Sequence, residues 1–109
     1  KDNYVTAVNG GTEYSISLDN IEKMELLDKL PDGFTRINGT SFENLQKGTF
    51  SAKGIVRMKV ILDPSQPPFI LITTKDNKKY LFGSRDENLT KSIHEEISKN
   101  LQASQDLQP

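Results

Sequence analysis

"IVRMKVIL", residues 55–62, carries the strongest secondary-structure signal in the chain. Its side chains alternate with the period of two that a β-strand produces. We expect a strand with one buried face and one largely solvated face. The face expected to be buried carries Val56, Met58, Val60 and Leu62, and the other face carries Arg57, Lys59 and Ile61.

The segments after this strand predict a loop, a hairpin and a helix. "DPSQPP" (63–68) is rich in turn formers, whereas "FILITT" (69–74) is apolar on both faces at its start and predicts a central strand. "KDNKK" (75–79) predicts a hairpin turn before the returning strand "YLFG" (80–83). Ser84 and Glu87 have the spacing of a capping box, which predicts that a helix starts here. Its apolar stripe recurs every four residues, at Leu89, Ile93, Ile97 and Leu101.

The segments before residue 55 predict more strands. Asn9-Gly10-Gly11 has the turn residues of a tight hairpin, and residues 13–18 alternate like a half-buried strand. "IEKMELLDKL" (21–30) fits either a strand or a helix, and its neighbours favour a strand. Residues 33–48 read as irregular, with one short strand near 35–37 and another near 49–52.

These elements predict a mainly β domain with one C-terminal α-helix. Sheets need their open edges protected, so we expect two antiparallel sheets in a partly open barrel that the helix caps. The chain has 109 residues, which fits one domain. We assign residues 1–102 to that domain and residues 103–109 to a flexible polar tail.

Composition narrows the function classes. Fourteen basic and fifteen acidic residues give a net charge of −1, which argues against nucleic acid as a partner. Without cysteine there is no disulfide, thiolate metal site or cysteine nucleophile. No apolar run is long enough for a membrane helix. Because the chain starts at Lys1, we expect a piece of a longer protein, in which an upstream segment could provide a membrane anchor.

"RINGTSFENLQKGTF" (36–50) has the glycines, lysine and hydroxyls of a phosphate-binding loop but not its order. That motif reads G-x-x-x-x-G-K-[ST] between a strand and a helix. Here Gly39 and Gly48 are too far apart, Lys47 precedes its glycine, and a strand-like segment follows. We therefore exclude a phosphate-binding loop of this kind.

Catalytic groups are also missing from the pattern. The single histidine, His94, lies on the flank of the apolar stripe, and Glu95 and Glu96 beside it do not share a helix face. Nothing satisfies the requirement for a nucleophile, a base and an orienting group. We expect a non-enzyme with no catalytic residues, metal site or cofactor.

A group of basic residues remains. If the strand 55–62 and the hairpin around 75–79 are neighbours, their cations form a small surface for phosphate or anionic lipid headgroups. The alternative is that these residues only keep the surface soluble, with Asp63 and Asp76 diluting their potential. The basic residues are Arg57, Lys59, Lys75, Lys78 and Lys79.

The order of "RINGT", "KGTF", a long alternating strand, "PFILITTKDNKKYLF" and one terminal helix resembles the bacterial pleckstrin-homology-like domains over residues 14–101. The resemblance implies two roughly orthogonal antiparallel sheets with the helix plugging one end. It also implies that Gly39 and Gly48 shape turns, that Phe50 enters the core, and that Arg36 orders a loop or holds an anion.

Relatives of this fold can bind inositol phosphates through basic residues in the first hairpin loop. Here that loop, "NGGTE" (9–13), has no lysine or arginine. We therefore expect a non-catalytic domain for protein–protein interaction or assembly in a larger bacterial protein. Its partner is another protein or a second copy, held through an edge strand. The alternative is the binding of anionic small molecules or lipid headgroups by the basic residues. Membrane contact would come only from segments outside this chain or from that weak patch.

Overall fold

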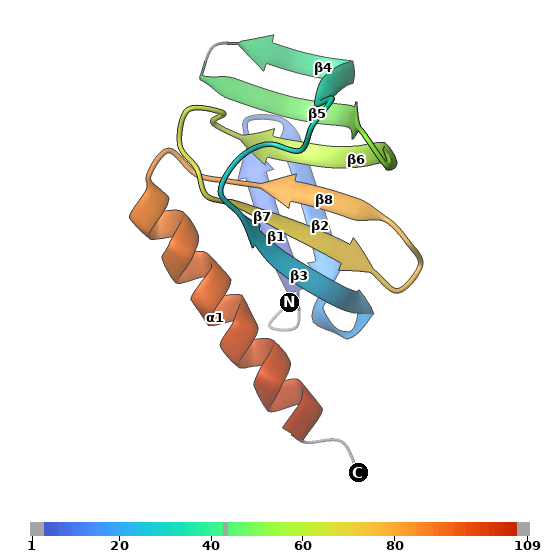
Figure 1. The fold of residues 1–109 in the computed structure, drawn as a ribbon. Helices are drawn as coiled ribbons and strands as arrows, with labels where there is room; N and C mark the ends of the chain where they lie inside the picture. The colour runs from blue at the N-terminus through green and yellow to red at the C-terminus, as the bar shows by residue number, and fades with distance from the viewer. Residues whose placement is uncertain (1–3, 43, 107–109) are drawn as a thin grey trace.

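The computed structural model describes residues 4–42 and 44–106, and eight strands precede one helix there (Figure 1). The chain is mainly β with a single C-terminal helix, as the sequence predicts. A short 3-10 helix, Leu18–Asn20, joins β2 to β3. The elements are β1 (Tyr4–Asn9), β2 (Thr12–Ser17), β3 (Ile21–Leu27), β4 (Thr35–Phe42), β5 (Leu45–Ala52), β6 (Ile55–Leu62), β7 (Phe69–Thr74), β8 (Lys79–Phe82) and α1 (Glu87–Asp106).

The strands form two sheets that do not close into a barrel. The larger sheet has the order β3-β7-β8-β6-β5-β4, and β1 and β2 form a separate ribbon. The expectation of purely antiparallel sheets is wrong for the larger one, because β6 and β8 run parallel. The reason lies in the loop after β6, which carries the chain past one strand position to β7. The β7–β8 hairpin then returns β8 into the gap beside β6, pointing the same way as β6.

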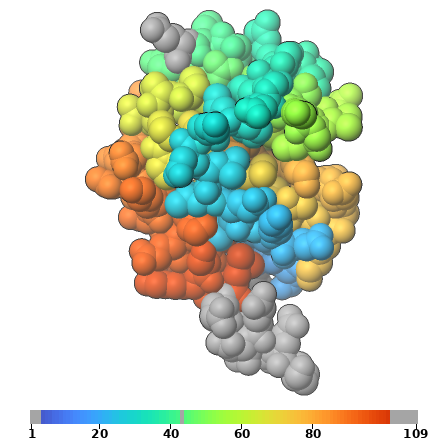
Figure 2. All heavy atoms as spheres, in the orientation of Figure 1, coloured from blue at the N-terminus to red at the C-terminus, as the bar shows by residue number. Residues whose placement is uncertain are grey.

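One face of the larger sheet holds the core built on Phe50. The loop between β3 and β4 crosses this face (Figures 1 and 2), and Phe34 from it stacks on Phe50 with ring centroids 4.7 Å apart. The predicted burial of Val56 is wrong, since this side chain is 86% exposed at the start of β6, before the buried residues begin at Met58. The buried residues of this face are Phe50, Met58, Val60, Leu62, Phe69, Leu71 and Leu81.

The opposite face is covered by the β1–β2 ribbon and by α1. Ile61 is buried here, so the face of β6 predicted to be solvated is covered at its C-terminal half. Tyr14 of the ribbon lies against the rings of Phe82 and Tyr80, at centroid distances of 6.4 and 6.3 Å. The buried residues of this face are Ile16, Ile21, Ile61, Ile70, Ile72 and Phe82.

Helix α1 begins differently from the prediction. Asp86 caps it, since its Oδ1 accepts hydrogen bonds from the amides of Asn88 (2.8 Å) and Leu89 (3.4 Å). The prediction that Ser84 and Glu87 form a capping box is therefore wrong. Ser84 instead lies before the cap, where its Oγ donates to the Asp86 carbonyl.

The buried side of the helix is also rotated from the predicted stripe. Ile97 is buried and Leu101 half-buried, but Leu89 and Ile93 are exposed, and Thr90 takes the buried place. The helix continues to Asp106 and so includes residues 103–106, which the sequence assigned to the tail. Residues 107–109 lie outside the described part of the chain.

Strands β4 and β5 occupy the segment predicted to be irregular. They pair along their whole length, with a register shift at Ile37. Gly39 and Gly48 lie opposite each other in mid-strand with φ of +116° and +126°, so the expectation that they shape turns is wrong. A Cβ on either one would lie 2.3 Å from a carbonyl oxygen of the partner strand. The glycines therefore permit a close approach of two backbones.

Several local predictions are confirmed. Gly10 and Gly11 turn the chain between β1 and β2, residues 21–27 form a strand, and β7 is central. Asn77 stands at the tip of the β7–β8 hairpin with φ of 67°, a conformation that asparagine tolerates. Phe50 is 1% exposed and lies in the core.

Candidate functional site

A notch opens between the β5–β6 hairpin and the β7–β8 hairpin, near the start of β6 and of β8. The pairing of β6 with β8 begins only at Lys59 and Tyr80, so the first four residues of β6 have no partner on β8. A hollow of about 270 Å³ lies at this point. We call it the basic notch, and its lining residues are Arg57, Met58, Lys59, Asn77, Lys78, Lys79 and Tyr80.

The basic notch gathers four of the six residues that the sequence singled out. Arg57 and Lys59 come from β6, and Lys78 and Lys79 from the start of β8 and its preceding turn. Lys75 stands in the same turn but does not line the hollow. Arg36 lies on β4, two strands away from β6, where its guanidinium donates a long hydrogen bond (3.5 Å) to the Gly39 carbonyl. Strand β6 pairs with β8, so the strand 55–62 and the hairpin around 75–79 are neighbours, as the predicted basic surface requires.

Threonine hydroxyls fix two of the amines. Lys59 Nζ lies 3.1 Å from Thr49 Oγ1, and Lys79 Nζ lies 3.2 Å from Thr73 Oγ1. Thr49 stands opposite Lys59 on β5, and Thr73 stands opposite Lys79 on β7. Both amines are therefore drawn away from the gap between β6 and β8, and they lie on opposite faces of the sheet. An ammonium has three N–H donors, so each of these lysines keeps two donors for another partner.

One lysine of the notch pairs with a carboxylate. Lys78 Nζ lies 3.8 Å from Asp76 Oδ2, and hydrogen bonds from Thr74 and Asn20 lower the pKa of the Asp76 carboxyl, so it is ionised at neutral pH. Asp76 nevertheless does not line the hollow. Asp63 follows the opposite end of β6, where hydrogen bonds from Ser65 lower the pKa of its carboxyl. The expectation that Asp63 dilutes the basic surface is therefore wrong.

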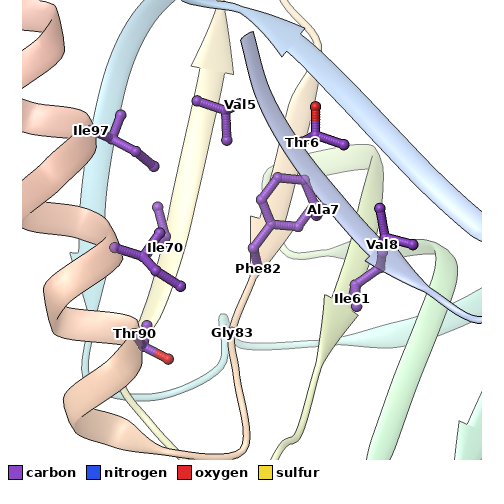
Figure 3. Close-up of a pocket in the computed structure, with 11 residues that line it drawn as sticks. Val5, Thr6, Ala7, Val8, Ile61, Ile70, Phe82, Gly83, Thr90 and Ile97 are labelled. Carbon is purple, nitrogen blue, oxygen red and sulfur yellow. The ribbon is translucent and has the colours of Figure 1, made fainter. Parts of the chain in front are cut away.

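A second hollow lies between β1 and α1 (Figure 3). Its volume is about 180 Å³ and most of its surface is apolar. Thr90 is almost fully buried in its wall, and the Thr90 hydroxyl is already bonded to the Ser84 amide (3.0 Å). We call this hollow the apolar crevice, and its lining residues are Val5, Thr6, Ala7, Val8, Ile61, Ile70, Phe82, Gly83, Thr90, Ile93 and Ile97.

The apolar crevice has no counterpart in the sequence pattern. It depends on the ribbon and the helix covering one sheet face side by side, which local periodicity does not encode. The apolar residues of β1 and the stripe of α1 were the available signals, but neither indicates that the two elements leave a gap.

Groups with catalytic or metal-binding chemistry do not cluster in residues 4–42 and 44–106. His94 is half-buried on α1 and lines neither hollow. Within these residues no three histidine, cysteine, aspartate or glutamate side chains lie together as metal ligands. No helix there is long and apolar enough to cross a bilayer.

Searches of protein-family models, of curated proteins and of solved structures found no match to this chain. Functional inference therefore depends on the residues of the two hollows and on the free edges of the sheets.

Proposed function

We propose that this chain is a non-catalytic interaction domain that binds an extended segment of a partner protein, or of a second copy, along the free edge of β1. The observation that carries the proposal is the lining of the apolar crevice by four consecutive residues, Val5, Thr6, Ala7 and Val8. Successive side chains of a strand point to opposite faces. Four in a row line a hollow only if it runs along the edge of the strand.

That edge is open for pairing. In the described part of the chain β1 pairs only with β2, so the backbone groups along its other side have no ladder partner. A strand added there would gain main-chain hydrogen bonds and would place every second side chain toward the crevice. The apolar lining favours an aliphatic side chain at that position.

Strand β4 is a second free edge and a weaker candidate. Seven of its eight residues are exposed, including Ile37 and Phe42. However, the register shift at Ile37 and the positive φ of Gly39 distort the strand, and such irregularity discourages pairing with another chain. The smoother edge of β1 is therefore the favoured site.

The proposed relationship to bacterial pleckstrin-homology-like domains is supported by the order of motifs and by the mainly β fold with a terminal helix. The parallel β6–β8 pair departs from the two antiparallel sheets that this relationship implies. A crystal structure in which that pair persists would count against the relationship, whereas two orthogonal antiparallel sheets would support it.

The interaction proposal is tested with a displayed library of random peptides. We expect selected peptides to carry alternating aliphatic residues, and their binding to be lost in Ile93→Lys, which places a charge at the rim of the crevice. Leu89→Lys is the matched control, because Leu89 is exposed on the same helix but does not line the crevice. Light scattering over a dilution series shows whether a second copy is the occupant. A monomeric domain that selects no peptide would refute the proposal.

A further inference from the structure

The turn between β1 and β2 determines which main-chain groups of β1 point away from β2. Asn9 and Thr12 close a two-residue turn, and Gly10 at its first position has a φ of +58°. The pair that closes such a turn exchanges both of its N–H···O=C bonds. Along an antiparallel ladder, pairs of this kind alternate with pairs that exchange none. The residues of β1 whose N–H and C=O groups therefore point to the free edge are Tyr4, Thr6 and Val8.

The side chains of the ribbon agree with this alternation. Thr6 Oγ1 lies 3.1 Å from Ser15 Oγ across the ladder, and side chains come closest in pairs that exchange no main-chain bonds. In the described part of the chain no strand pairs with β1 on this side. Thr6 and Val8 both line the apolar crevice, and no residue of β2 does. The open row of main-chain donors and acceptors therefore faces the crevice.

Strand β1 lacks the features that protect the other sheet edges. Charged side chains and irregular register discourage the addition of another strand. Strands β3 and β4 carry charged residues and register shifts, and β2 carries Glu13. Strand β1 has no charged residue, and its six residues pair with β2 in continuous register. Among the edge strands of residues 4–42 and 44–106 it is the one best suited to accept another strand.

A strand added to β1 would direct a side chain into the crevice. Residues opposite each other in a ladder point to the same face, and Ala7 packs toward the larger sheet. The residue opposite Ala7 would therefore point toward Ile61, Ile70 and Phe82, beside α1 (Figure 3). No charged side chain lines the crevice, so a charge placed there would lose its hydration without a partner. Because an apolar cavity of about 150 Å³ accepts benzene, the crevice has room for one large apolar side chain.

We propose that the partner is a flexible protein segment in which apolar and polar residues alternate, an inference that rests on the proposed function. Its main chain pairs with Thr6 and Val8, and it inserts one large apolar side chain opposite Ala7. The residues on either side of that side chain point to solvent. Strand β1 of a second copy does not fit, because its own Val5 and Ala7 pack against its own sheet. A helix does not fit either, since its main-chain groups bond to one another.

The first test measures the affinity of a short synthetic peptide in which threonine alternates with leucine. Replacing its central leucine with aspartate should weaken binding about tenfold or more, because the carboxylate would enter an apolar crevice. Replacing a neighbouring threonine with aspartate is the matched control. That side chain points to solvent, so the affinity should change less than about threefold. Equal losses for the two peptides would overturn the inference.

The second test follows amide hydrogen exchange by NMR. The leucine peptide should slow exchange at Thr6 and Val8 and leave Glu13 and Ser15, on the outer edge of β2, unchanged. Thr6→Pro removes one N–H from the β1 edge and should weaken binding about tenfold or more. Ser15→Pro removes the matching N–H from the β2 edge and should leave binding intact, since proline is tolerated at a free edge. Circular dichroism checks that both variants are folded.

The outcomes separate this inference from the proposed function. If no peptide binds, or if Ile93→Lys does not weaken binding, both fail. If Ile93→Lys weakens binding but the Thr6 and Val8 amides stay unprotected, an interaction at the crevice survives and this inference is overturned. Dimers that form as the concentration rises, and that Thr6→Pro abolishes, would identify a second copy as the occupant and would overturn it as well.

Discussion

Gly39 and Gly48 lie at a close approach between β4 and β5. Each has a φ that L-residues with a side chain rarely adopt, and each Cα faces the other across the β4–β5 ladder. A Cβ at Gly48 would lie 2.3 Å from the Asn38 carbonyl oxygen. Both the backbone conformation and the space therefore require glycine at these two positions.

Gly48→Ala is expected to lower the free energy of unfolding by about 2 kcal/mol or more, because strain and a backbone collision add together. Gly11→Ala is the control, since nothing lies within 4 Å of its Cβ position. We expect that change to stay within about 0.5 kcal/mol. Urea denaturation measures both values. Equal effects in the two variants would show that the strands are further apart than the structure places them.

For single residues, the sequence indicates which positions constrain the fold more reliably than it indicates the structural role of each. The resemblance implied the buried place of Phe50 and marked Gly39 and Gly48 as residues that shape turns. A turn and a close backbone approach both need glycine, so the residue type alone does not separate them. The exposure of Val56 depends on where the covering loop ends, which is a tertiary property.

Helix α1 depends on Asp86 for its first turn. Asp86→Ala removes the acceptor of two otherwise unpaired amides and should cost about 1 kcal/mol of stability. Glu87→Ala removes only the exposed pair with Lys91 and should cost less than about 0.5 kcal/mol. Thermal unfolding followed by far-UV circular dichroism compares them. A larger loss in Glu87→Ala would revive the capping box, in which the glutamate is an essential member.

Elements with a clear period were predicted, and elements without one were missed. Alternation identified β2 and β6, whereas an apolar run followed by turn residues identified the β7–β8 hairpin. Strands β4 and β5 were shortened in the prediction because their residues are polar or glycine on both faces. The helix itself was predicted, but its buried side was not, because Thr90 buries its hydroxyl through bonds to Ser84 and Asp86. Such satisfaction of a polar group is invisible in a hydrophobic pattern.

Across the whole molecule, one sheet supports two cores. Strands β6, β7 and β8 contribute buried side chains to both faces. Loss of packing on one face therefore loosens the strands on which the other face depends. We expect a single cooperative unfolding transition, as is usual for a domain of this size.

Phe50→Ala tests this coupling and should cost about 3–5 kcal/mol. Tyr14 and Tyr80 lie on the opposite face, so their fluorescence reports on the second core. The midpoint from tyrosine fluorescence and the midpoint from far-UV circular dichroism should fall together. Phe42→Ala, at a site that is 64% exposed, should move neither appreciably. Separate midpoints in Phe50→Ala would show that the two faces unfold independently.

The global topology lay beyond what the sequence predicts. Fold class follows from many short strands and one terminal helix. The parallel contact of β6 with β8 follows from a loop that passes one strand position, and loop composition does not specify such a path. That Arg57 and Lys59 line the same hollow as Lys78 and Lys79 depended on that contact, so it was only a conditional expectation.

The place of β3 at the edge of the larger sheet also affects synthesis. Its only neighbour in that sheet is β7, the fourth strand after it in the chain. The ribosome releases β1, β2 and β3 well before β7 exists, so Ile16 and Ile21 have no sheet to cover them at that stage. Pairing between such distant segments is slow, and unpaired strand edges are prone to aggregate. The nascent segment from β1 to β3 is therefore the part of this chain that would most need a chaperone during translation.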